Sequence, residues 1–138
     1  MSEPERTYDG LTFVFDVDGT ICPIKGPDER YEDLVPYAEV VARMREYHDG
    51  GARIIINSSR NMRTYDGNVG LINRHTAPVM LAWLEKWGIP YDEIVFAKPW
   101  PGRLGFYVDD RTIRPDEFLR LTPEQMGEAC RASREELR

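Results

Sequence analysis

The sequence predicts an α/β protein built on an open parallel sheet with flanking helices. Short apolar runs of strand length alternate along the chain with amphipathic segments of helical spacing. The connections between the apolar runs are long enough for the crossover helices that parallel strands require. The 138 residues match the usual size of one domain, and no repeat or linker divides them. We therefore expect residues 1–138 to form a single domain.

Four apolar runs are expected to form the strands. They cover residues 11–15, 53–56, 93–97 and 106–108, and each stops at polar or charged residues. None contains a glycine or proline in its interior. Such uninterrupted apolar runs are typical of strands in a parallel sheet.

The amphipathic segments predict the helices. Apolar residues recur at helical spacing over residues 34–47, with Asp33 as the expected N-cap. A second helix is expected over residues 80–87, after a long polar loop, and one or two more in the tail. The last of these is predicted to span residues 123–137.

Charge and composition limit the classes of partner. Eighteen basic against 24 acidic residues give a net charge of −6, which disfavours a protein whose main task is binding a nucleic-acid backbone. No apolar run is long enough to cross a membrane, and residues 1–10 lack the apolar core of a signal peptide. The two cysteines show neither paired nor metal-type spacing. A cytoplasmic protein with no nucleic-acid or membrane partner is expected.

Every predicted strand ends in residues that can carry chemistry. Ligands of open parallel sheets bind outside the carboxyl ends of the strands, and six such residues occupy these ends: Asp16, Asp18, Ser58, Lys98, Asp109 and Asp110. Crowded carboxylates repel one another unless a cation neutralises them, and Mg²⁺ suits a few carboxylates together with a phosphate. The lysine and the serine hydroxyl add a positive charge and a donor. This set of groups predicts a magnesium-dependent site for phosphoryl transfer, in which a carboxylate is the covalent nucleophile.

The motif FDVDGT at residues 15–20 resembles the first motif of the haloacid dehalogenase superfamily of phosphatases. The strand that ends in Ser58, the lysine Lys98 and the pair Asp109-Asp110 follow in the order of that superfamily. The segments NSSRNMRTYDGNVG, AKPW and GFYVDDRTIRPDEF are further similar to its small capsular-polysaccharide-biosynthesis phosphatases. The resemblance implies a Rossmann-like core with no cap domain.

The resemblance also implies roles for the residues of the first motif. Asp16 would attack phosphorus and bind Mg²⁺ through its other oxygen. Asp18 would protonate the leaving alcohol, deprotonate the hydrolytic water and reach the metal through its backbone carbonyl. Gly19 would contribute to phosphate binding, and Thr20 would support the loop.

The later motifs supply the remaining implied roles. Ser58 would bind a phosphate oxygen, with the adjacent Ser59 as the alternative hydroxyl. Lys98 would neutralise the nucleophile and the phosphate. Asp109 would complete the metal site, with Asp110 as a ligand through water or as a hydrogen-bond acceptor beside it.

Polar residues in the neighbouring loops are candidates for binding the rest of the substrate: Arg60, Asn61 and Arg111. The segments between the first three motifs leave no room for a cap domain. We therefore expect a hydrolase of a small phosphorylated metabolite such as a sugar, polyol or amino-alcohol phosphate, in cell-surface polysaccharide synthesis. A capless core is compatible with a homo-oligomer in which a neighbouring subunit closes the site. The alternatives are a polynucleotide 3′-phosphatase, which shares the core and an Asp-Asp-Arg run, and a catalytically idle binding or scaffold module.

Overall fold

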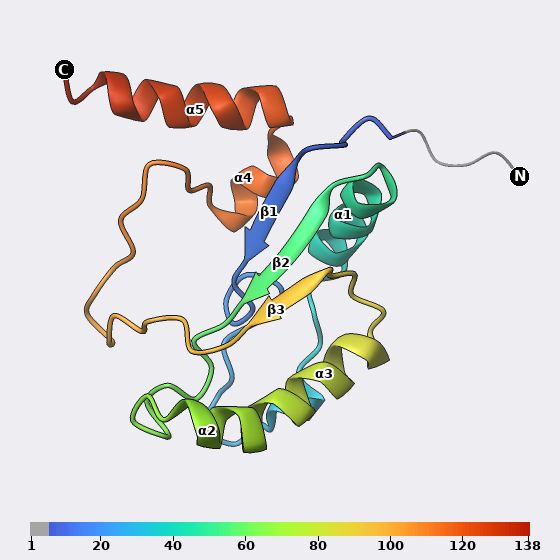
Figure 1. The fold of residues 1–138 in the computed structure, drawn as a ribbon, viewed down its shortest axis with the longest axis vertical. Helices are drawn as coiled ribbons and strands as arrows, with labels where there is room; N and C mark the ends of the chain where they lie inside the picture. The colour runs from blue at the N-terminus through green and yellow to red at the C-terminus, as the bar shows by residue number, and fades with distance from the viewer. Residues whose placement is uncertain (1–5) are drawn as a thin grey trace, which may run out of the picture. The chain divides into compact units, whose positions relative to one another are not determined.

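Three short strands form an open parallel sheet in the computed structural model, which describes residues 6–138 (Figure 1). They are β1 (Thr12–Phe15), β2 (Arg53–Asn57) and β3 (Glu93–Val95), hydrogen-bonded in the order β1-β2-β3. The register places Phe15 of β1 opposite Ile56 of β2. Because all three strands run in the same direction, their carboxyl ends lie at one edge of the sheet. The predicted α/β fold with a parallel sheet is confirmed.

The described residues fall into two compact units, which divide after Trp100. Unit 1 extends to Trp100 and contains the sheet, and unit 2 is Pro101–Arg138. The predicted single domain stays a prediction.

The helical segments of unit 1 connect its strands. A 3-10 turn η1 (Tyr31–Asp33) and helix α1 (Ala38–Asp49) lie between β1 and β2. Between β2 and β3, α2 (Val69–Leu71), the π-helical turn η2 (Ile72–Thr76) and α3 (Ala77–Lys86) follow one another without a break. Each connection thus holds loops and helices, as a crossover between parallel strands requires.

The prediction for the start of the first helix was wrong. Asp33 belongs to the 3-10 turn η1, and α1 begins at Ala38 with Tyr37 as its N-cap. Pro36 explains the difference, because a proline ring disfavours the helical conformation of the preceding residue, here Val35. The end of the helix at Gly50 matches the sequence.

The second helical run also begins earlier than predicted. The sequence indicated a polar loop as far as residue 79, but the chain is helical from Val69. Asn68 caps this start, since its side-chain oxygen accepts a 3.2 Å hydrogen bond from the amide of Leu71. Most side chains of residues 69–76 are exposed, so the apolar periodicity of this segment is weak. The sequence pattern therefore did not predict the helix there.

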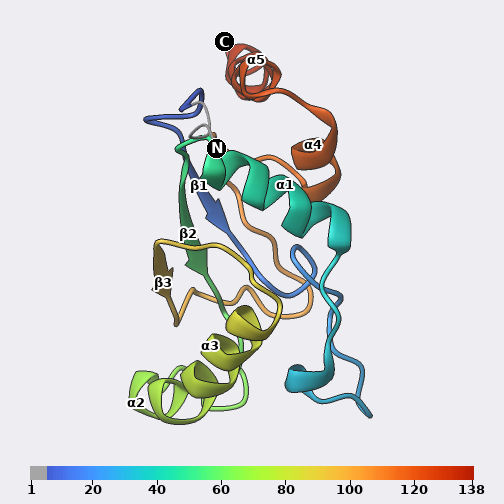
Figure 2. The same ribbon diagram turned by 90° about the vertical axis from the view of Figure 1, so that its right-hand side faces the viewer.

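The core of unit 1 lies between the sheet and its helices. Tyr47 of α1 packs on Phe13 of β1 with ring centroids 4.8 Å apart, and α1 covers that face of the sheet (Figure 2). Trp83 of α3 is buried and donates a 2.7 Å hydrogen bond from its indole nitrogen to the carbonyl oxygen of Leu34. This bond joins α3 of the second crossover to the chain that precedes α1 in the first.

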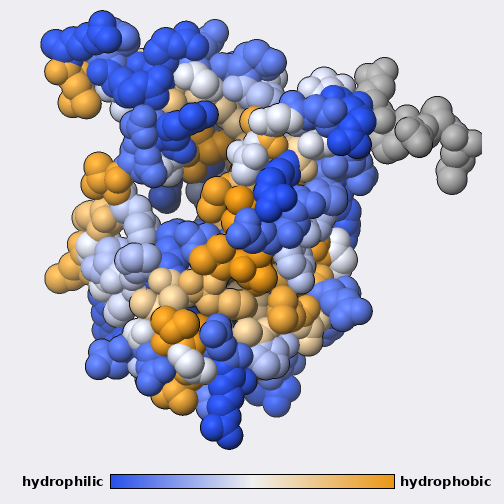
Figure 3. Space-filling view, viewed as in Figure 1, coloured by the Kyte–Doolittle hydropathy of each residue, from blue (hydrophilic) through white to orange (hydrophobic). Residues whose placement is uncertain are grey.

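The opposite face of the sheet is less covered. Val14 of β1 is 63% exposed and Val95 of β3 is 43% exposed. Apolar side chains gather over this part of the surface, which faces the viewer in Figure 3.

Unit 2 consists of an irregular segment followed by two helices. Helices α4 (Pro115–Arg120) and α5 (Pro123–Glu135) both begin with a proline in the first turn. In α4 the Glu117 side chain accepts a 2.8 Å hydrogen bond from the Arg114 amide, whereas in α5 Thr122 and Gln125 form a reciprocal cap. One or two helices were expected in the tail, and the structure shows two. None of the helices within residues 6–138 is long and apolar enough to cross a bilayer.

The strand predicted over residues 106–108 was wrong. The structure shows no strand there, and Phe106 and Val108 are 86% and 96% exposed. A run of three apolar residues gains too little from its own interactions to be stable as a strand without a hydrogen-bonded neighbour. Asp109 and Asp110 therefore lie in an irregular segment and do not follow a strand.

Candidate active site

The strand ends of unit 1 place three predicted site residues at one edge of the sheet. Asp16 directly follows β1, Ser58 directly follows β2, and Lys98 lies shortly beyond β3. The amide of Ser58 donates a 3.0 Å hydrogen bond to the carbonyl oxygen of Val95. The amide of Lys98 donates a 3.1 Å hydrogen bond to the carbonyl oxygen of Ser58. The ammonium nitrogen of Lys98 is 3.9 Å from Oδ1 of Asp16. The structure therefore brings Lys98 beside both Asp16 and Ser58.

A tight loop after β1 presents Asp16. The amides of residues 20–22 all donate to the carbonyl oxygen of Val17 at 2.8–3.3 Å, which closes the loop on itself. Gly19 permits this closure, because its φ of +84° lies in the left-handed region that other residues rarely adopt. The Thr20 hydroxyl lies 3.5 Å from Oδ2 of Asp16.

Burial dominates the electrostatics of Asp16. Loss of solvent raises the pKa of this carboxyl above its ordinary value, and the neighbouring Asp18 raises it further. The Lys98 ammonium group and a hydrogen bond from the Val17 amide oppose the increase. A partly buried carboxylate beside a lysine gains from any further cation that enters the site.

Asp18 forms an ion pair with Arg60 that the sequence did not predict. Nε and Nη2 of Arg60 donate to the two carboxylate oxygens of Asp18 at 3.1 and 2.8 Å. The Arg60 side chain is 1% exposed and that of Asp18 is 24% exposed. A pair with two parallel hydrogen bonds is the strongest type of contact between these groups. Nε and Nη2 of Arg60 are therefore engaged by Asp18, and the expected substrate contact of Arg60 stays a prediction.

Tyr31 completes the surroundings of Arg60. The guanidinium carbon lies 4.1 Å from the centroid of the Tyr31 ring, within the range of a cation–π contact. Burial and the nearby Asp18 carboxylate raise the pKa of the Tyr31 phenol. No pattern along the chain pointed to Tyr31, because its contact with residue 60 is made only in the folded chain.

Cys22 lies at the end of the same loop, where its surroundings disfavour the thiolate form. Its thiol is buried, and its Sγ is 3.8 Å from Oδ1 of Asp18. Burial, followed by the Asp18 charge, raises the pKa of the thiol to about 12. A thiol in this state is almost entirely protonated at neutral pH, so it is unreactive.

The two adjacent serines differ in their surroundings. Ser58 is 1% exposed, and its Oγ accepts a 3.1 Å hydrogen bond from the Arg60 amide. This bond leaves the hydroxyl proton of Ser58 to be donated. Ser59 is half-buried. Both remain candidates for the phosphate-binding hydroxyl.

Asn61 holds the loop after β2 against the next helix. Its backbone adopts a φ of 63°, and its Oδ1 accepts a 2.7 Å hydrogen bond from the hydroxyl of the buried Thr76. Its amide nitrogen donates to Thr64 at 3.2 Å. The side chain is thus used in local structure, and its predicted substrate contact stays a prediction. Thr76 was not among the predicted residues.

The remaining predicted residues lie in unit 2. The amide of Arg111 donates a 3.2 Å hydrogen bond to Asp109, and this bond is the main reason that the pKa of Asp109 lies below its ordinary value. Arg134 of α5 lies 3.7 Å from the Asp110 carboxylate. All four side chains are exposed, and the metal-binding roles of the two aspartates stay predictions.

A magnesium ion fits the donors that unit 1 supplies at the sheet edge. Asp16 offers carboxylate oxygens, the ligand type that Mg²⁺ prefers. Among residues 6–138, no three His, Cys, Asp or Glu side chains form a ready cluster for a metal. The two carboxylates of the loop instead stand beside Lys98 and Arg60.

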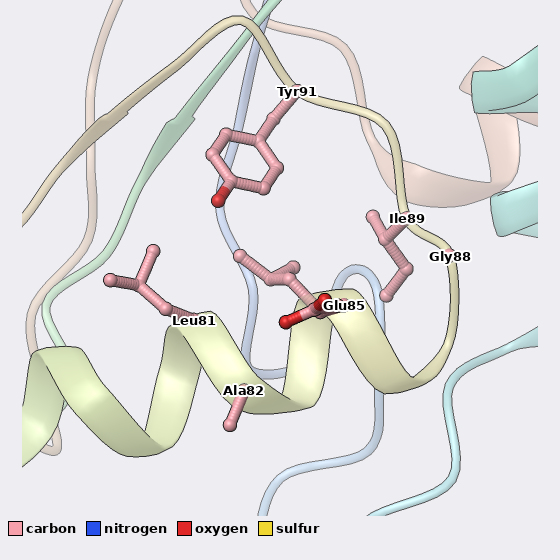
Figure 4. A pocket seen from close by; sticks show the side chains of 7 residues that line it. Leu81, Ala82, Glu85, Gly88, Ile89 and Tyr91 are labelled. Carbon is pink, nitrogen blue, oxygen red and sulfur yellow. The ribbon is translucent and has the colours of Figure 1, made fainter.

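A separate open hollow of about 590 Å³ lies between α3 and the chain that leads into β3. Figure 4 shows the residues that line it, with Leu81, Ala82 and Glu85 on the helix and Ile89 and Tyr91 on the chain that follows. Glu85 is its one carboxylate, and the hollow lies near the amino end of β3, away from Asp16 and Lys98. The candidate active site is therefore the carboxyl edge of the sheet.

Comparisons with known proteins identify a relative but no activity. No family model and no curated protein matches the sequence. The crystal structure of an MCSG target from Vibrio cholerae is 43% identical in sequence, with a TM-score of 0.83. The match covers 89% of this chain and 98% of that one. This chain belongs to the same protein family as the Vibrio cholerae protein.

Proposed function

We propose that this protein is a phosphomonoester hydrolase of the haloacid dehalogenase type, with Asp16 as the nucleophile. The observation that carries the proposal is the pairing of Asp16 with Lys98 at 3.9 Å on the carboxyl edge of a parallel sheet. A carboxylate nucleophile needs a nearby cation that also neutralises the phosphate, and a single lysine between them serves both. The motif order from Asp16 to Asp110 supports the same chemistry.

The proposed reaction has two steps. An oxygen of Asp16 attacks phosphorus, the bond to the ester oxygen breaks, and the departing alcohol takes a proton from Asp18. In the second step a water molecule attacks the phosphorus of the aspartyl phosphate. Asp18 takes the proton of this water, inorganic phosphate leaves, and the Asp16 carboxylate is regenerated.

The chain's own residues organise both steps. Lys98 holds the phosphate beside Asp16, and Ser58 or Ser59 donates a hydrogen bond to a phosphate oxygen. The proposed ligands of Mg²⁺ are Asp16, Asp18 through its backbone carbonyl, Asp109 and Asp110. When bound, Mg²⁺ supplies positive charge that offsets the repulsion between the nucleophile and the phosphate.

The proposed substrate is a small phosphorylated metabolite. Both segments between the strands of unit 1 contain only loops and helices, and neither holds a separate domain that could cover the site. Two of the chain's three lysines, Lys25 and Lys86, lie in other segments, and acidic residues outnumber basic ones. A long polyanion would find few of the contacts that it needs. A sugar, polyol or amino-alcohol phosphate suits such a site.

Phosphate release from a panel of monophosphates tests the proposal. The panel contains sugar, polyol, amino-alcohol and nucleoside monophosphates with Mg²⁺, and the Asp16→Asn variant is assayed beside the wild type. We expect release from at least one small metabolite and its loss in Asp16→Asn, because an amide cannot form the acyl phosphate. Asp49→Asn, a change at the exposed end of α1, is the matched control. Activity that survives in Asp16→Asn would contradict the covalent mechanism, and an inactive wild type would support a binding or scaffold role.

A further inference from the structure

Arg60 is the most deeply buried charged side chain in the part of the chain that the structure describes. Its guanidinium lies between the Asp18 carboxylate and the face of the Tyr31 ring. Its backbone is also fixed, because the Arg60 amide donates to Oγ of Ser58. Side chain and backbone are thus held from three sides, so Arg60 has little freedom to move.

We propose that Arg60 is a positioning residue that fixes the orientation of Asp18 for proton transfer to the leaving group. This inference rests on the proposed function, since it assigns Asp18 the proton-transfer role. Two parallel hydrogen bonds of 3.1 and 2.8 Å hold both oxygens of one carboxylate in the plane of the guanidinium. Oδ1 also lies 3.8 Å from the Cys22 thiol, whereas Oδ2 keeps a second lone pair, so the pair leaves Asp18 able to hold or accept a proton on Oδ2.

The rigidity of the pair gives it a functional consequence. A free aspartate rotates about two side-chain torsions, and a proton donor must lie within hydrogen-bond reach of the leaving oxygen. Asp18 stands on a loop where the neighbouring Gly19 has a φ of +84°. The loop alone does not set the carboxylate plane, whereas the buried fork of Arg60 does.

Lysine cannot replace this contact. Its ammonium group is a single point of charge on a flexible chain, whereas the guanidinium offers a planar fork that matches a carboxylate. Arg60→Lys keeps the positive charge beside Asp18 and removes the fork. The variant therefore separates orientation from charge.

The test compares kcat/KM for an alkyl phosphate and an activated aryl phosphate, because only the alkyl leaving group depends on a proton. We expect Arg60→Lys to lower kcat/KM for the alkyl phosphate about tenfold or more and to change the aryl value less than about threefold. In Asp18→Asn the difference between the losses of kcat/KM for the alkyl and aryl phosphates should be larger than in Arg60→Lys. Adding Arg60→Lys to Asp18→Asn should cause no further loss for the alkyl substrate, because Arg60 acts through Asp18. Arg53→Lys is the matched control, since Arg53 forms an exposed pair with Glu93 at 3.0 Å.

Tyr31→Leu provides a second variant if Arg60→Lys does not fold, as judged by circular dichroism and thermal unfolding. It removes the ring under the guanidinium and keeps Arg60, so the same contrast between alkyl and aryl substrates is expected, at smaller size. Equal losses of kcat/KM for the two substrates, or a further loss in the double variant, would overturn the positioning role of Arg60. In that case the activity of the wild type would still support the proposed function. A wild type that hydrolyses neither substrate would contradict the proposed function itself.

Discussion

The backbone amide of Lys98 donates a 3.1 Å hydrogen bond to the carbonyl oxygen of Ser58. This bond joins the chain beyond β3 to the chain beyond β2 and continues the pairing of the two strands past their ends. It fixes the backbone of Lys98 independently of its side chain, whose ammonium group reaches to within 3.9 Å of Asp16. A substitution of the lysine side chain therefore leaves the main-chain anchor in place.

Lys98→Met is expected to lower kcat/KM for phosphate release by about a hundredfold or more, since it removes a preorganised charge at the reacting phosphate. The fold should persist, because the main-chain bond to Ser58 does not involve the side chain. Lys86→Met in α3 is the control for loss of one lysine. Phosphate release and circular dichroism of both variants provide the measurement, and an active Lys98→Met protein would refute the role of this lysine.

Asp109→Asn is expected to raise the Mg²⁺ concentration for half-maximal activity by about tenfold or more, and Asp110→Asn by less. The effects should differ because Asp109 is proposed to bind the metal directly and Asp110 indirectly. Titration of phosphate release with Mg²⁺ measures both. Asp116→Asn in α4, whose carboxylate forms an exposed pair with Arg120 at 3.8 Å, should leave the titration unchanged. The reverse order of the two effects would exchange the assignments of Asp109 and Asp110.

The salt dependence of KM distinguishes a small substrate from a nucleic acid. We expect KM for the preferred metabolite to change less than about tenfold between about 50 and 200 mM salt, whereas a protein with many backbone contacts loses about a thousandfold in affinity. The small number of lysines and the net charge of −6 are the reason. Assays with a metabolite and with a 3′-phosphorylated oligonucleotide at both salt concentrations measure this. A steep salt dependence with efficient oligonucleotide dephosphorylation would favour the polynucleotide 3′-phosphatase.

Trp83→Phe is expected to lower the free energy of unfolding by about 1–3 kcal/mol, because the buried carbonyl oxygen of Leu34 loses its 2.7 Å hydrogen bond. Trp87→Phe is a matched control. The Trp87 indole nitrogen is buried and has no hydrogen-bond partner among residues 6–138, so its removal breaks no such bond. Urea unfolding of both variants measures the difference, and equal losses would show that the hydrogen bond contributes little.

Asp92 is expected to give the fold part of its acid sensitivity. Its Oδ2 accepts a 2.8 Å hydrogen bond from the Ile54 amide, which is the main reason that its pKa lies below the ordinary value of 3.8, and His48 adds a second contact at 3.2 Å. A lowered pKa in the folded state means that the ionised form stabilises the fold above pH 3.8. That stabilisation is lost as the pH falls through the folded value.

Asp92→Asn should therefore lower the free energy of unfolding by about 0.5–1 kcal/mol at neutral pH, and by progressively less in acid. Urea unfolding between neutral pH and the acid limit of stability measures this dependence. The exposed Asp49→Asn serves as the control. A loss of the same size at every pH would show that the charge of Asp92 does not stabilise the fold.

Much of unit 1 could be predicted from the sequence because its signals are local. The apolar runs before Asp16 and Asn57 form strands, and helix ends such as that at Gly50 depend on nearby residues. The order of the strands then places Asp16, Ser58 and Lys98 at one edge, since parallel strands end on the same side. Local patterns predicted two helix starts wrongly, one near Pro36 and the other at the polar segment that begins with Asn68.

Only the tertiary structure decided the partners of the candidate site. The sequence placed Arg60 in a loop near phosphate, but the folded chain pairs it with Asp18 and stacks it on Tyr31. These three residues come from separate segments, and no spacing along the chain encodes their contact. The apolar run at residues 106–108 shows the same limit, because a strand exists only when a neighbouring strand supplies its hydrogen bonds. Periodicity reports which face of a segment is apolar, whereas ion pairs and strand pairing depend on what the rest of the chain brings next to it.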